Sequence, residues 1–161
     1  MSKLTFALQM EIDGEQYYLK QAEKNQNNAL QHAFTLLAQA EKKHADLVKR
    51  LMKVKEDGFA DDLLPAESPN PFTDLSDFER DAALMPDQLE IYTIAMGLEQ
   101  KSIDLYQEML TQAKEELEKK ILEFLVIQEK QHLAFFEELA RLLKRPKEWV
   151  EDAEFGLREE Y

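Results

Sequence analysis

The sequence predicts an all-α protein in which four long helices pack into one bundle, connected in up-down-down-up order. Glu, Lys, Leu, Gln and Ala, which favour helices, are abundant, whereas only four Gly and five Pro are present to interrupt them. Apolar residues recur at alternating spacings of three and four in four separate segments. With 161 residues and 44% hydrophobic content, the chain is expected to form a single domain over residues 1–161.

The first two helices are predicted as a pair within residues 3–56. The periodic segments are residues 3–25 and 28–56, and Gly58 marks the end of the second. Because so few residues separate the two segments, we expect them to form an antiparallel hairpin.

The other two helices are predicted as a pair within residues 86–144. The periodic segments are residues 86–113 and 115–144. Pro86 followed by an acidic residue is typical of a helix start. A short connection again predicts an antiparallel hairpin.

Two further segments lie outside these pairs. Residues 57–85 are too many for a tight turn and include three of the five Pro, which predicts a crossover that lets the second and third helices run parallel. Short first and third connections with a long middle one match the ferritin-like form of the four-helix bundle. Residues 145–161 form a C-terminal tail, in which we expect a short last helix after Pro146.

Each predicted helix places a carboxylate on the stripe of residues that should face the bundle interior. In the second helix, Glu41 and His44 interrupt an apolar series that runs from Leu30 to Leu51. The fourth helix has the same interruption, and the first and third contribute one Glu each. The six residues are Glu11, Glu41, His44, Glu99, Glu129 and His132.

These buried charges predict a site for two metal ions. Burying a carboxylate costs several kcal/mol, and mutual repulsion would raise the pKa of each carboxyl unless a cation compensated it. No Lys or Arg lies on the four stripes. Two divalent ions would supply the missing charge, and oxygen and imidazole ligands accept iron, manganese or zinc. In a Glu-x-x-His pair the two residues lie about 60° apart around the helix, so both can reach one ion.

An internal repeat supports a symmetric site. A shift of 88 residues lays the first half of the chain on the second, and the apolar frame repeats together with the charged residues. We expect two similar helix pairs related by a pseudo-twofold axis. The pairs of residues that coincide are Glu11 with Glu99, Glu41 with Glu129, His44 with His132, and Tyr18 with Tyr106.

Two tyrosines and a third histidine lie near these residues in the sequence. Tyr18 and Tyr106 each follow the Glu of their helix by seven residues. They are either core aromatics or donors of hydrogen bonds to ligand carboxylates. His32 has no partner at metal-ligand spacing, so we expect an ordinary surface or helix-start histidine.

The composition excludes several classes of function. A net charge of −13 and a pI near 4.7 argue against nucleic acid and anionic membranes as partners. No apolar run approaches a membrane span, and the N-terminus does not resemble a signal peptide, so we expect a cytoplasmic protein. The sequence contains no Cys, which excludes thiolate ligands and iron–sulfur clusters within it.

The order Glu, Glu-x-x-His, Glu, Glu-x-x-His resembles the di-iron carboxylate proteins, and the rubrerythrin family in particular. The segments EIDGEQYY and EQKSIDLY are similar to the rubrerythrin motifs of the first and third helices. The resemblance implies two Fe ions, with Mn or Zn as possible substitutes. It implies three kinds of ligand: bridging Glu41 and Glu129, terminal Glu11 and Glu99, and His44 and His132 on one metal each.

The resemblance also implies an oxidoreductase that reduces peroxide or dioxygen. Because no Cys is present to hold a rubredoxin-type iron, electrons are expected from a separate donor protein such as a rubredoxin. We expect a homo-oligomer, with a dimer favoured. The alternatives are iron oxidation with storage or transfer, as in bacterioferritins, and a non-enzymatic metal-binding bundle. A hydroxylase of the demethoxyubiquinone type would share the ligands, but this acidic sequence has no evident membrane-binding helix.

One position departs from the rubrerythrin pattern. Rubrerythrins carry a seventh carboxylate three residues after the Glu of the third helix, where this chain has Ser102, opposite Gly14 in the repeat. A neutral hydroxyl cannot balance the added charge of a ferric ion. We therefore expect slower peroxide turnover than in a complete rubrerythrin.

Overall fold

The computed structural model describes residues 2–57 and 88–156, with side chains to residue 144. The regular elements within these ranges are helices. They are α1 (Lys3–Lys24), α2 (Ala29–Asp57), α4 (Leu89–Gln112) and α5 (Glu116–Gly156). None of these helices combines the length and apolar character that crossing a membrane requires.

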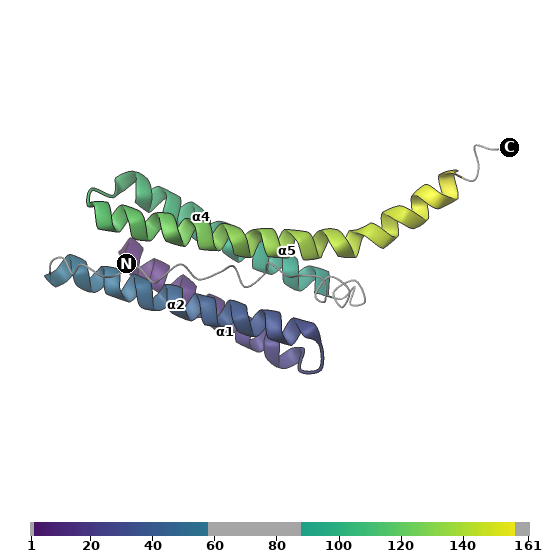
Figure 1. Cartoon of the computed structure of the whole chain (residues 1–161), viewed down its shortest axis with the longest axis horizontal. Helices are drawn as coiled ribbons and strands as arrows, with labels where there is room; N and C mark the ends of the chain where they lie inside the picture. The colour runs from purple at the N-terminus through teal and green to yellow at the C-terminus, as the bar shows by residue number, and fades with distance from the viewer. Residues whose placement is uncertain (1, 58–87, 157–161) are drawn as a thin grey trace.

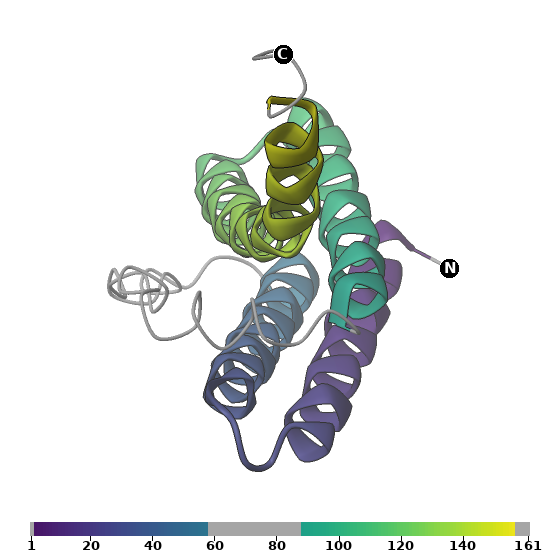
Figure 2. The same ribbon diagram turned by 90° about the vertical axis from the view of Figure 1, so that its right-hand side faces the viewer.

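The helices form two antiparallel hairpins that pack against each other. Short connections join α1 to α2 and α4 to α5, and the two hairpins meet where α1 contacts α4 and α2 contacts α5 (Figures 1 and 2). Figure 1 shows that α2 and α4 run in the same direction. The predicted up-down-down-up bundle is therefore confirmed. The predicted crossover, with Gly58 and the helix start at Pro86, lies outside the described residues.

Polar side chains fix the ends of the first hairpin. The Ser2 hydroxyl accepts a hydrogen bond of 3.1 Å from the Thr5 backbone N–H and so caps the start of α1. At the turn, the Asn28 side chain accepts from the Leu30 backbone N–H at 2.9 Å and donates to the Asn25 side chain at 3.1 Å. The two asparagines thereby stop α1 and start α2 within a few residues.

The C-terminal end differs from the prediction. In place of a separate short helix after Pro146, α5 continues unbroken to Gly156. Proline removes one backbone hydrogen bond and crowds the carbonyl four residues earlier, but a helix can absorb this by bending. Figure 1 shows that α5 curves and extends beyond the other helices. The sequence signal that predicted a break here instead accompanies a bend.

Two apolar clusters fill the bundle interior, one toward each end. Tyr18, Phe34 and Phe136 are central to the cluster near the α1–α2 turn. Val48 and Leu125 belong to the cluster at the opposite end. Full burial of such a side chain stabilises the fold by about 1.5–3 kcal/mol, so these clusters hold the bundle together on both sides of its middle.

Candidate metal site

The middle of the bundle, between the two apolar clusters, is polar. All four helices contribute to it, and each does so on the stripe that the sequence predicted. The exposed fraction of each residue is 4% or less. The residues are Glu11 on α1, Glu41 and His44 on α2, Glu99 on α4, and Glu129 and His132 on α5.

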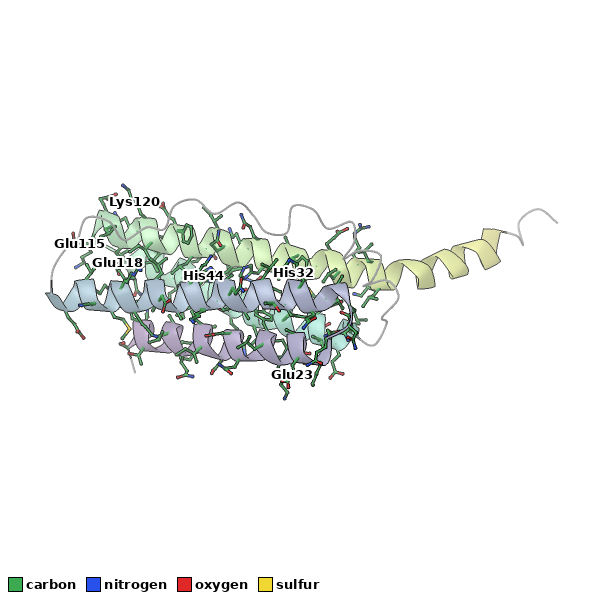
Figure 3. The ribbon with its side chains drawn as sticks, turned by 60° about the horizontal axis from the view of Figure 1, so that its bottom comes forward. Glu23, His32, His44, Glu115, Glu118 and Lys120 are labelled. Carbon is green, nitrogen blue, oxygen red and sulfur yellow. The ribbon has the colours of Figure 1, made fainter. Side chains whose placement is uncertain are left out.

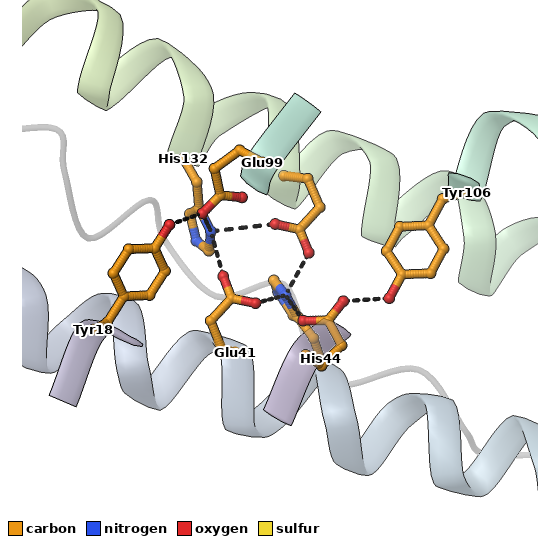
Figure 4. A network of polar contacts seen from close by, with 8 residues as sticks. Tyr18, Glu41, His44, Glu99, Tyr106 and His132 are labelled. Carbon is orange, nitrogen blue, oxygen red and sulfur yellow. Dashed lines mark hydrogen bonds and ion pairs between the residues drawn. The ribbon is translucent and has the colours of Figure 1, made fainter. Parts of the chain in front are cut away.

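His44 points its Nδ1 atom at three carboxylates from three helices. This nitrogen lies 3.0 Å from Glu129 Oε1, 3.4 Å from Glu11 Oε2 and 3.9 Å from Glu41 Oε2 (Figure 4). The Glu-x-x-His spacing turns both side chains of α2 toward one point.

His132 makes the corresponding contacts from the other hairpin. Its Nδ1 atom lies 3.0 Å from Glu41 Oε1, 3.4 Å from Glu129 Oε2 and 3.5 Å from Glu99 Oε1. The His132 and His44 rings are nearly parallel, with centroids 5.5 Å apart. Each contact of His44 thus has a counterpart at His132 after the shift of 88 residues, which supports the predicted pseudo-twofold arrangement.

The side chains can be grouped into two overlapping sets, each able to hold one ion. Within each set one ligand atom per residue can be chosen so that all lie within 4.8 Å of one another. Glu41 and Glu129 belong to both sets, which is the geometry required of carboxylates that bridge two metals. The first set is Glu11, Glu41, His44 and Glu129, and the second is Glu41, Glu99, Glu129 and His132.

Each tyrosine donates a hydrogen bond to a carboxylate of the opposite helix pair. The Tyr18 hydroxyl on α1 donates to Glu99 Oε1 on α4, and the Tyr106 hydroxyl on α4 donates to Glu11 Oε1 on α1 (Figure 4). Burial, followed by the nearby carboxylates, raises the pKa of both hydroxyls, so they remain donors. Of the two sequence interpretations, the structure supports the hydrogen-bonding one.

Burial and repulsion raise the pKa of two of the carboxyls. Burial is the larger cause at Glu41 and Glu99, and the charge of Glu129 comes next. The pKa of Glu41 lies well above its usual range, and that of Glu99 is raised to about 8. In the metal-free protein Glu99 therefore holds a proton at neutral pH.

The histidines and Glu129 shift in the direction that favours their charged forms. Burial alone would lower the pKa of His44, but Glu129 and Glu11 outweigh it and raise this pKa to about 10. Burial likewise opposes the shift at His132, whose pKa is raised well above its usual range, with Glu99 the largest favourable influence. Burial would raise the pKa of Glu129, but the two histidines hold it well below its usual range.

The donor set fits a pair of divalent cations. Within the described residues, the buried atoms Glu11 Oε2 and Glu129 Oε2 each lie 3.4 Å from a histidine nitrogen but have no hydrogen-bond partner. A buried oxygen in that position is costly unless something else satisfies it. Four carboxylates balance the charge of two divalent ions, and neutral imidazoles complete a set that suits iron, manganese or zinc. Metal binding would therefore give these two oxygens a partner and balance the charge of the carboxylates.

The remaining residues singled out in the sequence are not members of these two sets. His32 and His44 are both on α2 (Figure 3), but His32 is exposed and does not join the cluster. Ser102 is buried on α4, one turn after Glu99. The sequence did not predict that each tyrosine would donate to a carboxylate of the opposite helix pair. Residue spacing within one helix does not show which carboxylate on another helix a side chain can reach.

The fold and this cluster define a four-helix protein with a buried carboxylate–histidine cluster that could hold metal ions. The family model described as Rubrerythrin matches residues 3–140. The chain therefore belongs to the rubrerythrin family. Comparison with curated proteins and with solved structures gives no match.

Proposed function

We propose that the protein is a di-iron oxidoreductase that reduces a peroxide or dioxygen with electrons from a separate donor protein. The observation that carries the proposal is the pair of four-residue sets that share Glu41 and Glu129 in the middle of a rubrerythrin-family bundle. Bound iron would supply two electrons, one from each ion, to an oxygen–oxygen bond.

The proposed ligand roles follow from which set each residue joins. Glu41 and Glu129 would bridge, because each offers an oxygen to both sets. Glu11 with His44 would complete one metal site, while Glu99 and His132 complete the other. The tyrosine hydroxyls hold Glu11 and Glu99 in the rotamers that face the cluster. The two apolar clusters pack the bundle on either side of these residues.

The electron donor is proposed to be a second protein. No Cys is available in the sequence to hold an iron–sulfur or rubredoxin-type centre, so a protein such as a rubredoxin would deliver electrons one at a time. We also propose a homo-oligomer, with a dimer favoured. A large hollow assembly would instead point to iron storage by the same set of ligands.

Metal analysis and stopped-flow spectroscopy test this function. Protein purified anaerobically and titrated with Fe(II) should bind about two ions, as expected for two sets of ligands. Mixing the loaded protein with hydrogen peroxide or dioxygen should oxidise both ions in single turnover. Ser102→Glu should speed reoxidation by hydrogen peroxide if the new carboxylate reaches a metal. Failure to bind iron between the helices, or loaded protein that reacts with neither oxidant, would refute the proposal.

A further inference from the structure

A cleft between α1 and α4 leads from the surface to the candidate metal site. Its volume is about 450 Å³. Two of the proposed ligands, Glu41 and Glu99, line it, together with Tyr18. The cleft is therefore a direct route from solvent to atoms that the proposed metals would contact, and it opens on the face of the bundle where the two hairpins meet.

Two small residues open the inner end of this cleft. Gly14 on α1 and Ser102 on α4 both line it, and they occupy equivalent positions in the two halves of the chain. A Cβ atom added at Gly14 would lie 3.3 Å from Glu41 Oε2, closer than ordinary contact. Larger side chains at these positions would fill the space beside the carboxylates. Ser102, at which this chain departs from the rubrerythrin pattern, therefore leaves space at the inner end of the cleft.

The volume of the cleft exceeds what hydrogen peroxide or dioxygen requires. A water molecule takes up about 30 Å³ in the liquid, and hydrogen peroxide is only slightly larger. Sites for small organic molecules have volumes of about 300–1,000 Å³, the range into which this cleft falls. Its walls include the apolar side chains of Phe6, Met10, Leu98 and Leu105. An occupant with an apolar organic group would use this surface.

The charges at the rim favour a neutral occupant. Asp13 and Asp104 are exposed acidic residues on opposite sides of the cleft, and each accepts a hydrogen bond from a glutamine of its own helix. Glu108 adds a third carboxylate, whereas Lys101 is the one basic residue of the lining. With a chain of net charge −13 behind this rim, an anionic molecule would be repelled.

We propose that this cleft binds a neutral organic hydroperoxide, ROOH, as the substrate of the metal site. The inference rests on the proposed function and names the class of peroxide. The apolar group lies against Phe6, Met10, Leu98 and Leu105, and the hydroperoxide end passes between Gly14 and Ser102. The Ser102 hydroxyl can donate a hydrogen bond to a peroxide oxygen or accept one from its O–H.

The reduction of ROOH needs two electrons, which bound iron and the separate donor protein would supply. The oxygen–oxygen bond would break with two electrons supplied by bound ferrous iron, one from each ion, and two protons from solvent, so that ROOH yields ROH and water. The separate donor protein then restores the ferrous pair. The alcohol product keeps the apolar group and occupies the same walls, so it serves as an unreactive probe of binding.

Binding to zinc-loaded protein tests the cleft without any redox chemistry. The probe is cumyl alcohol, the product of cumene hydroperoxide, and the readout is the set of amide NMR shifts during titration. We expect saturable shifts along α1 and α4 around Gly14 and Ser102. Phe6→Ser, at a half-exposed wall residue, should weaken binding, and Ser102→Leu should weaken it by about tenfold or more by filling the inner end. Thr93→Leu, on the exposed face of α4, is the matched control and should leave binding unchanged.

Stopped-flow measurements with iron-loaded protein separate this inference from the proposed function. Cumene hydroperoxide should reoxidise the protein faster than hydrogen peroxide at equal concentration, and Ser102→Leu should remove that preference. Reaction with hydrogen peroxide at an equal or higher rate, combined with no shifts from cumyl alcohol, would overturn the organic substrate but leave the peroxide-reducing function standing. Protein that reacts with no oxidant would overturn both.

Discussion

At the scale of single residues, the four carboxylates of the site are not equivalent. Glu41 belongs to both four-residue sets, whereas Glu11 belongs to one. Glu41→Gln should therefore weaken binding of both ions, and Glu11→Gln should weaken mainly one. Titration with Zn(II), followed by calorimetry and metal analysis, would measure this, with Glu23→Gln at an exposed position of α1 as control. Equal losses from both site variants would contradict the bridging role of Glu41.

The tyrosine hydroxyls provide a second comparison between residues. Tyr18→Phe removes the hydrogen bond to Glu99 and leaves a buried carboxylate oxygen short of a donor. We expect a loss of about 1–3 kcal/mol in the free energy of unfolding of the metal-free protein. Metal affinity should fall by about 10–100-fold. Urea denaturation and zinc titration would measure these effects.

Tyr92→Phe is the matched control for this change. Tyr92 is also fully buried, but its hydroxyl has no hydrogen-bond partner among the described residues. Removing that hydroxyl should be neutral or slightly stabilising, because a buried polar group without a partner is unfavourable. If Tyr18→Phe behaved like Tyr92→Phe, the hydrogen bond to Glu99 would have no role in holding the site.

At the scale of helices, two glycines test how closely α1 approaches the site. Gly97 on α4 has nothing within 4 Å of an added Cβ, so Gly97→Ala should stabilise the protein by up to about 1 kcal/mol through helix propensity. At Gly14 the same Cβ meets Glu41 Oε2 at 3.3 Å, so Gly14→Ala should gain less stability and weaken metal binding. Urea denaturation and zinc titration would compare them. If both variants gained the same stability and metal affinity did not change, the contact between residue 14 and Glu41 would not be close enough to affect the site.

The helices could be predicted because their apolar spacing repeats over many residues. The contacts between helices were harder to predict from the sequence. The seam positions of Glu41 and His44 followed from spacing alone, and the structure places both inside. Pro146 misled the prediction, because a local helix-breaking signal cannot show whether a long helix bends or ends. The cleft was not predicted either, since it arises where Gly14 and Ser102 from different hairpins come together.

At the scale of the whole molecule, the bundle's stability should depend on metal and pH together. In the metal-free protein the pKa of Glu99 is about 8 and that of His44 about 10. Both exceed the values of the unfolded chain, near 4.5 and 6.5. The folded state therefore binds more protons than the unfolded state between these limits, and its stability falls as pH rises. The lowered pKa of Glu129 acts in the opposite sense but only under acidic conditions, well below this range.

Bound metal should weaken this dependence of stability on pH, because it takes the place of the protons in the cluster. Ions bind deprotonated carboxylates and neutral imidazoles, so loading releases protons and its affinity rises with pH. We predict that the melting temperature of metal-free protein falls between pH 6 and pH 9, as expected from linkage. The melting temperature of the zinc-loaded protein should fall less over the same range. The difference in melting temperature between the zinc-loaded and metal-free protein should therefore widen as pH rises. Circular dichroism melts of chelator-treated and zinc-loaded samples would measure it. A metal-free melting temperature that is constant or rises over this range would contradict the protonation assigned to Glu99 and His44.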